Sequence, residues 1–258
     1  MKLMAVLLLT ILFFNFAKKP NNINPTGTNP VASSSIHDSS KIHFSNNSSL
    51  RRIPSVIRDL SIALNESMFQ WEGIVSWNRF SVDLRDVVHK SFDTSATVAY
   101  RPGDTVYYIT LNKFNKQASD RALAVTLIHE IMHCVLMDID RRARYGDEKA
   151  LLLTERLNQK LKNPFGIADN SFFGMMNMGD AGQHELMYQF FYKDMVCLLE
   201  RFAKIHKPVF FQHEDAELLI WSGLQFTSGY QKLSFEEKRK IEFTILREKG
   251  ILTSFLDY

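Results

Sequence analysis

The sequence predicts an α+β fold with a small N-terminal β-sheet, an apolar central helix and a mostly helical C-terminal half. Runs rich in β-branched and aromatic residues lie before residue 113, and helical periodicity dominates after residue 119. The chain has 258 residues, of which 45% are hydrophobic and 23% charged. This balance is typical of a globular protein with a sizeable core. We expect the folded domain to cover residues 51–258.

The N-terminus predicts export. Lys2 precedes an apolar stretch, residues 3–17, that has the length of a signal-peptide core and is short for a bilayer-spanning helix. We therefore expect residues 1–17 to be a signal peptide or a membrane tether, and the protein to be periplasmic, secreted or membrane-anchored. Residues 18–50 are dominated by Asn, Ser, Pro and Thr and have little to bury. They predict a flexible linker.

The first elements of the domain are a helix and a hairpin. Residues 54–68 predict a helix that has Pro54 in its first turn. Residues 95–112, SATVAYRPGDTVYYITLN, predict a β-hairpin, because two runs rich in Val, Tyr, Thr and Ile flank the turn sequence RPGD. Its second strand, residues 105–111, is expected beside a cleft, where an extended substrate could pair with the sheet.

Helices make up the rest of the chain. Ser119 or Asp120 is expected to cap a long helix that ends at about Arg144, before Gly146. Another helix is predicted for residues 148–162.

A loop and three further helices are predicted after it. Gly and Asn punctuate residues 163–180, which predict a mobile loop at one wall of the cleft. The next helix should run from Asp180 to about His206, with Asp180 and Gln183 as a variant capping box. Two further helical stretches close the chain, residues 214–223 and 235–249.

The long helix carries an H-E-x-x-H motif in the sequence HEIMH, from His129 to His133. At about 100° per residue, His129 and His133 lie one above the other, so both imidazoles can bind one metal ion. Zinc lowers the pKa of a coordinated water to about 7, and Glu130 beside it can take the proton as a general base. The predicted cofactor is therefore Zn²⁺.

The surroundings of the motif favour a metal site over a chance match. Thr126, His129, Glu130 and His133 form one polar stripe on a helix that is otherwise apolar almost all round. Buried ionisable groups are costly unless they are paired or coordinate a metal. The alternative is a pair of core histidines that are satisfied by hydrogen bonds.

A catalytic zinc site needs a third protein ligand and an open position. His184 lies at the centre of the predicted apolar face of its helix, so it is expected to point inward and to complete the site. Glu185 lies about 100° round from it and is the weaker candidate. Asp138 follows the motif closely, and Glu155 is expected to point toward solvent.

The remaining histidines and the cysteines are expected to be structural. His206 and His213 are interpreted as residues near helix ends. Cys134 and Cys197 each lie in an apolar helical stretch, where a free cysteine packs as a small hydrophobe. A disulfide between them is the alternative in an oxidising compartment.

Two segments of the chain resemble a known family. Residues 107–137, YYITLNKFNKQASDRALAVTLIHEIMHCVLM, resemble the strand and active-site helix of the SprT-like zincin metallopeptidases. Residues 183–195, QHELMYQFFYKDM, resemble the later histidine-bearing helix of some exported bacterial members. The resemblance implies a zincin-like fold. It also implies that His129, His133 and His184 are the metal ligands and Glu130 is the catalytic base.

The predicted function is that of an exported, zinc-dependent metallopeptidase acting on peptide or protein substrates. The net charge is +3 and no stripe of Lys and Arg is present, so no nucleic-acid partner is expected. The first alternative is a catalytically silent zincin-like domain that binds or scaffolds partners in the cell envelope. The second is a cytoplasmic SprT-like protein that acts near DNA. Glu130 favours an enzyme, because a structural zinc site needs no base.

Overall fold

The computed structural model describes residues 42–46, 48, 51–66, 80–87, 96–100, 106–112, 117–206 and 211–250. The predicted signal peptide or anchor, residues 1–17, lies outside the described residues, as does most of the predicted linker.

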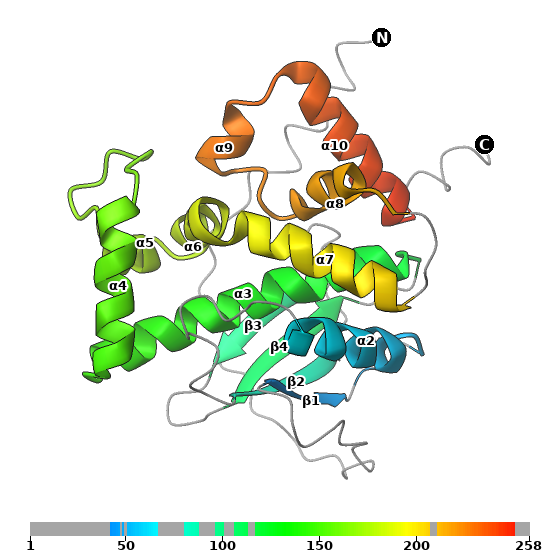
Figure 1. The fold of residues 1–258 in the computed structure, drawn as a ribbon, viewed down its shortest axis with the longest axis horizontal. Helices are drawn as coiled ribbons and strands as arrows, with labels where there is room; N and C mark the ends of the chain where they lie inside the picture. The colour runs from blue at the N-terminus through cyan, green and yellow to red at the C-terminus, as the bar shows by residue number, and fades with distance from the viewer. Residues whose placement is uncertain are drawn as a thin grey trace.

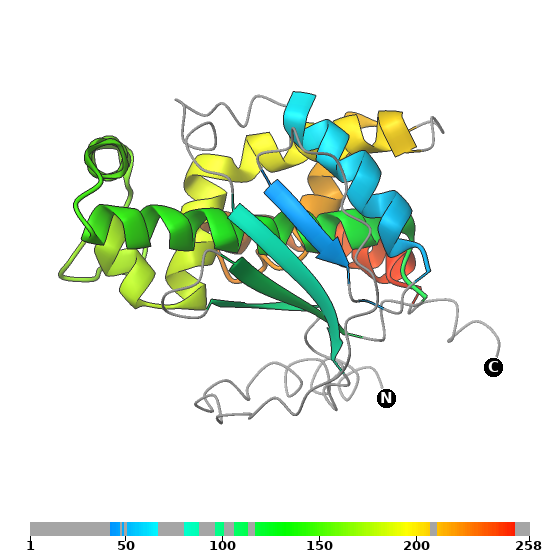
Figure 2. The ribbon, with the colours of Figure 1, turned by 90° about the horizontal axis from the view of Figure 1, so that it is seen from below.

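The fold is α+β, with a four-stranded sheet on one side of a central helix and further helices on the other (Figures 1 and 2). The strands are β1 (Ile42–Asn46), β2 (Phe80–Val87), β3 (Ala96–Tyr100) and β4 (Val106–Asn112). The central helix is α3 (Asp120–Arg144), and the other helical elements are α2 (Ile53–Glu66), α4 (Glu148–Lys160), α5 (Phe172–Asn177), α6 (Asp180–Leu186), the π-helical turn η3 (Met187–Phe191), α7 (Tyr192–His206), α8 (His213–Ile220), α9 (Ser228–Gln231) and α10 (Phe235–Glu248).

The sheet has the order β1-β2-β4-β3. β1, β2 and β4 are parallel, whereas β3 pairs antiparallel with β4 and places Tyr100 opposite Tyr107. This pairing confirms the predicted hairpin. The strand that precedes α3 is β4, and it is interior to the described sheet because β2 and β3 flank it. The strand at the free edge beside β4 is therefore β3, and the substrate-pairing prediction for residues 105–111 falls on the wrong strand.

β1 corrects the predicted linker. Residues 42–46 pair in parallel with β2, with Ile42 opposite Phe80. The described fold therefore begins before Arg51. Ile42 and Phe44 alternate with polar residues over only five positions, which is a weak strand pattern. The polar composition of the surrounding residues therefore led to the prediction of a linker. For the remaining residues of 18–50 that lie outside the described part, the linker stays a prediction.

α3 follows the sequence prediction closely. The side chain of Ser119 accepts a hydrogen bond from the Ala122 amide at 3.0 Å, and the helix ends at Arg144, before Gly146 with its φ of +81°. By length and composition α3 could cross a membrane, but 94% of its most apolar window is buried inside the protein. Its apolar surface is therefore covered by the rest of the fold, between the sheet and α7 (Figure 1).

The segment predicted as a loop, residues 163–180, contains a helix. Residues 172–177 form α5, which Ser171 caps, and the side chain of Phe172 is fully buried. Near the far end of α3, Arg144 donates a hydrogen bond to Asn177 at 3.1 Å. The α5 part of the segment therefore packs against α3, α4 and α6, whereas residues 163–170 are mostly exposed. Its mobility stays a prediction.

The next helix differs from the predicted single element. α6 begins at Asp180, but its N-cap is Gly179 with a φ of +67° and without a side-chain hydrogen bond. The predicted capping box of Asp180 and Gln183 is therefore wrong. The π-helical turn η3 separates α6 from α7, and such turns often occur at functional sites.

Both cysteines are free, and they lie in different environments. Cys134 is fully buried on α3, as predicted. Cys197 is exposed on α7, so its predicted burial is wrong; it lies on the solvent side of a helix whose buried positions include Val196 and Leu198.

Two histidines outside the H-E-x-x-H motif each lie between two carboxylates. His206, at the end of α7, places Nδ1 2.7 Å from Asp59 of α2 and Nε2 3.0 Å from Asp120 of α3. Its side chain is 8% exposed. His213 lies between Glu200 and Glu217 at 2.9 and 3.3 Å, with a side chain that is 62% exposed. His206 therefore joins three helices in the interior, whereas His213 makes a similar contact in solvent.

This difference predicts unequal effects on stability. His206→Ala should lower the free energy of unfolding by about 3 kcal/mol, because it removes one partner of the buried Asp59 carboxylate and of the Asp120 carboxylate. Asp59 would keep its ion pair with Arg58, and Asp120 its ion pair with Arg52. His213→Ala should cause no measurable loss, because exposed ion pairs contribute little. Denaturant unfolding of both variants measures the difference, and equal losses would contradict this account.

Candidate metal centre

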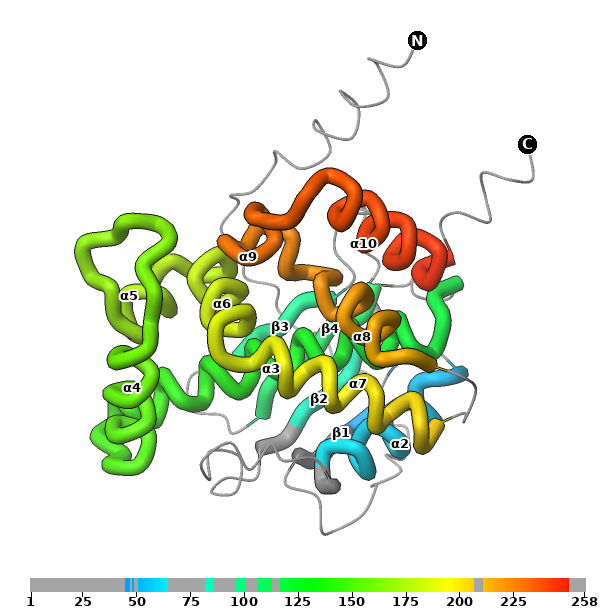
Figure 3. The backbone as a smooth tube through the Cα atoms, turned by 45° about the horizontal axis from the view of Figure 1, so that its top comes forward, coloured from blue at the N-terminus to red at the C-terminus, as the bar shows by residue number. Residues whose placement is uncertain are grey.

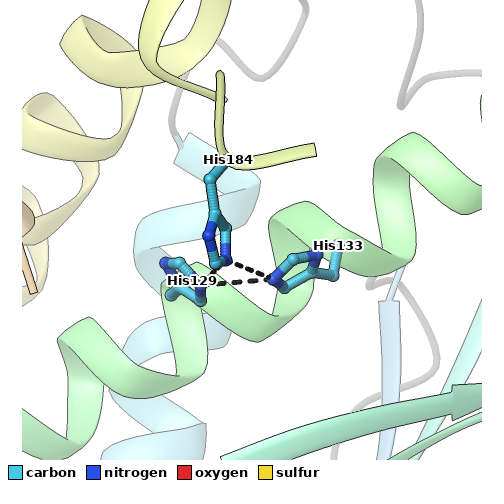
Figure 4. A group of neighbouring side chains, drawn as sticks. All are labelled: His129, His133 and His184. Atoms are coloured by element: carbon cyan, nitrogen blue, oxygen red, sulfur yellow. Dashed lines mark hydrogen bonds between the residues drawn. The ribbon is translucent and has the colours of Figure 1, made fainter. Parts of the chain in front are cut away.

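Three imidazole nitrogens converge at one point between α3 and α6 (Figure 4). The Nε2 atoms of His129 and His133 are 3.2 Å apart, and each lies 3.1 Å from Nε2 of His184. His129 and His133 come from successive turns of α3, whereas His184 comes from α6. The structure thus brings together the three histidines that the sequence selects.

The geometry fits a metal ion better than a set of hydrogen bonds. A neutral imidazole has a single N–H, so three mutually facing nitrogens cannot all be satisfied by one another. Zinc binds histidine nitrogen at about 2.0–2.1 Å, and ligand nitrogens in a tetrahedral site are then about 3.3 Å apart. The observed separations of 3.1–3.2 Å are close to that value. The group could therefore hold a metal ion.

The surroundings keep all three imidazoles in the neutral form that binds metals. Burial is the largest cause in each case: it lowers the pKa of His129 and His133 and brings the pKa of His184 to about 4. The hydrogen bond that His133 donates to Gln183 and the negative charge of Asp180 oppose this effect and raise the pKa of His133. At neutral pH the lone pairs are thus available for coordination.

Gln183 orients one of the rings. Its side-chain Oε1 lies 2.7 Å from Nδ1 of His133 and accepts a hydrogen bond from that nitrogen. The proton is then held at Nδ1, which leaves Nε2 with a free lone pair directed at His129 and His184. Sequence reasoning assigned Gln183 to a helix cap and missed this contact. Its position next to His184 was the available signal.

Glu130 directly follows His129 on α3. Its side chain is buried, and the pKa of its carboxyl is raised to about 8, first by burial and then by the negative charge of Asp180. Within the described part of the chain, no hydrogen bond holds the Glu130 carboxylate. A bound cation would favour the ionised form and lower this pKa again. The group is therefore available for proton transfer.

The other candidate ligands have different roles. Asp138 accepts hydrogen bonds from Arg141 at 2.7 Å and from the hydroxyl of Tyr107 at 3.3 Å. Glu155 is exposed on α4, as predicted. Glu185 is fully buried and accepts hydrogen bonds from Ser228 and Gln189. None of these carboxylates belongs to the histidine group.

The glycine at the end of the predicted helical stretch 214–223 lies against the site. Gly223 has a φ of +92°, and a Cβ atom at this position would lie 2.5 Å from Cε1 of His129. The Nδ1 atom of the same ring is buried and has no hydrogen-bond partner among the described residues. This approach depends on the tertiary fold, and the sequence WSGL around Gly223 carried no signal for it.

Comparison of the chain with protein-family models, with curated proteins and with solved structures gave no match. Membership of the SprT-like family therefore stays a prediction, and the geometry of the site carries the functional argument.

Proposed function

We propose that this protein is an exported, zinc-dependent metallopeptidase of the SprT-like zincin type. The observation that carries the proposal is the convergence of the Nε2 atoms of His129, His133 and His184, together with the buried carboxyl group of Glu130, which follows His129 on α3. Three neutral nitrogen ligands, with a glutamate adjacent in sequence to one of them, match the needs of catalytic zinc, which requires three protein ligands and an open position.

The residues divide the chemistry between them. When bound, zinc would act as a Lewis acid that activates water and polarises the scissile carbonyl. The three imidazoles would hold the ion, and Gln183 fixes the tautomer of His133. Glu130 takes a proton from the attacking water at a carboxylate oxygen and delivers it to the leaving amine. The burial of these groups strengthens the electrostatic interactions among them.

The sheet offers a place for an extended substrate. β3 is an edge strand of the described sheet, and it packs against α3. A peptide could extend the sheet along the free edge of β3 by backbone hydrogen bonds. This assignment moves the proposed substrate-pairing strand from β4 to β3, because among the described strands β3 has a pairing partner on one side only.

The proposed export rests on the N-terminal sequence. Lys2 and the apolar residues 3–17 have the organisation of a signal peptide or an anchor. The mass of the mature N-terminus tests it. Cleavage near Ala17, or retention of this segment in a membrane fraction, is expected, whereas a cytoplasmic protein with an intact Met1 would favour the alternative role near DNA.

Metal removal tests the activity itself. The full chain is incubated with a peptide library as purified, after treatment with a chelator, and after return of Zn²⁺. We expect cleavage that stops on chelation and recovers with about one equivalent of zinc, because the three imidazoles provide one site. Cleavage that persists without metal would contradict the proposal. Zinc binding without any cleavage would favour the silent scaffold domain.

A further inference from the structure

The turn between α8 and α9, residues 221–228, contacts the metal centre although it supplies no ligand. We call it the 221–228 turn. It leads from Trp221, the residue after α8, to Ser228, the first residue of α9. Figure 3 shows α9 beside α6, the helix that carries His184, and hydrogen bonds join the two elements.

The part of the turn at Gly223 directly contacts the proposed ligand His129. A Cβ atom at Gly223 would lie 2.5 Å from Cε1 and 2.8 Å from Nδ1 of His129, so only a residue without a side chain fits beside the ring. The imidazole is buried, and its Nε2 is already placed by the neighbouring histidines. The Gly223 backbone therefore limits the positions that this ring can adopt.

The other end of the turn, at Ser228, is hydrogen-bonded to Glu185, the residue that follows the proposed ligand His184. The amide of Ser228 donates to Oε2 of Glu185 at 2.8 Å, and its hydroxyl donates to Oε1 at 2.6 Å. Gln189 donates to the same Oε1 at 2.9 Å. Glu185 is fully buried and directly follows His184 in α6. This carboxylate therefore anchors the turn to the helix that carries the third histidine.

Internal hydrogen bonds run along the turn, including one from the Thr227 amide to the Leu224 carbonyl at 3.1 Å. The Gly223 amide donates to the side chain of Gln225 at 3.0 Å, and the Leu224 amide donates to the carbonyl of Trp221 at 2.9 Å. The indole of Trp221 stacks on Tyr188 of η3 at a centroid distance of 5.7 Å. A displacement of the backbone at Gly223 is therefore expected to shift the backbone at Ser228 as well.

We infer that the 221–228 turn is a positioning element of the metal centre, which fixes His129 through Gly223 and His184 through Glu185. His129 belongs to α3 and His184 belongs to α6. Because the 221–228 turn contacts both helices, it fixes the separation between the Nε2 atoms of the two histidines. The inference rests on the metal site of the proposed function and extends it to residues that bind no metal. Partners of this kind, outside the ligand set, typically contribute 10–100-fold to metal affinity.

Gly223→Ala and Gly146→Ala form a matched pair that tests the inference. Both glycines have a positive φ, +92° and +81°, so each alanine carries the same kind of backbone strain. A Cβ at Gly146 would have no atom of the described residues within 4 Å. Gly223→Ala should bind Zn²⁺ roughly 10–100-fold more weakly and change the visible absorption spectrum of the Co²⁺-loaded protein. Gly146→Ala should keep wild-type values. Identical affinity and spectrum in the two variants would overturn the inference.

A second pair of variants tests the inference if circular dichroism shows that Gly223→Ala does not fold. Ser228→Ala removes the 2.6 Å bond to Glu185, whereas Ser222→Ala changes a hydroxyl in the same turn for which the described structure shows no bond. Ser228→Ala should weaken Co²⁺ binding by about tenfold and Ser222→Ala should not. Unchanged binding in Ser228→Ala would then overturn the inference. A wild-type protein that binds Co²⁺ but cleaves no peptide would reject the proposed function and leave this test intact.

Discussion

Glu130→Gln is expected to lower kcat/KM for peptide cleavage by about 10²–10⁴-fold, the usual cost of removing a general base. The amide has nearly the same shape as the carboxyl group but cannot take a proton from water. Zinc content should stay near the wild-type value, because the three imidazoles, and not Glu130, form the convergent group. Stability should not fall, because the described structure shows no hydrogen bond that depends on the ionised carboxylate. Steady-state kinetics and metal analysis on the same preparation measure both effects.

The control for this variant is Glu155→Gln. Glu155 is exposed on α4 and lies outside the histidine group, so its substitution should leave kcat/KM unchanged. Near-normal turnover in Glu130→Gln would remove the general base from the mechanism. A large loss of zinc in the same variant would instead make Glu130 a ligand.

His184→Ala is expected to lower zinc affinity by more than about 100-fold, because it removes a direct ligand and outer partners alone contribute 10–100-fold. The remaining pair, His129 and His133, would hold the ion at two positions of a tetrahedral site. Isothermal titration with Zn²⁺ measures the loss. His213→Ala is the matched control, since this histidine is exposed and bonded to glutamates away from the site.

Full zinc occupancy in His184→Ala would show that the third ligand comes from elsewhere. The described structure offers no second group of this kind, because Asp138 and Glu185 are engaged in hydrogen bonds of their own. That result would also contradict the role of metal ligand that the resemblance to SprT-like proteins implies for His184.

The parts of the fold that local sequence determines were predictable. α3 has a capping serine, a long apolar run and a glycine after its end, and these signals predicted a start at Ser119 or Asp120 and an end at about Arg144, as observed. The hairpin of β3 and β4 follows from two alternating runs around one turn. The approach of His184 to α3 was predictable too, because a histidine at the centre of an apolar face must point toward the core.

The parts that depend on distant contacts were not predictable in the same way. β1 is short, and its place in the sheet depends on β2, which lies more than thirty residues further along the chain. Gln183 fits a helix cap by spacing, but its amide is used at His133 instead. The role of Gly223 depends on the position of the turn after α8 in the tertiary fold. The local sequence around Gly223 does not indicate that the residue lies against the His129 ring.

The proposed zinc site consists of His129, His133 and His184 together. Anomalous diffraction at the zinc absorption edge, from crystals of the zinc-loaded full chain, would locate the ion. We expect one strong peak about 2.0–2.1 Å from each of the three Nε2 atoms, with the Glu130 carboxylate outside the ligand set. A loaded protein whose zinc peak lies away from these nitrogens, or is bound by only two of them together with a carboxylate, would contradict it.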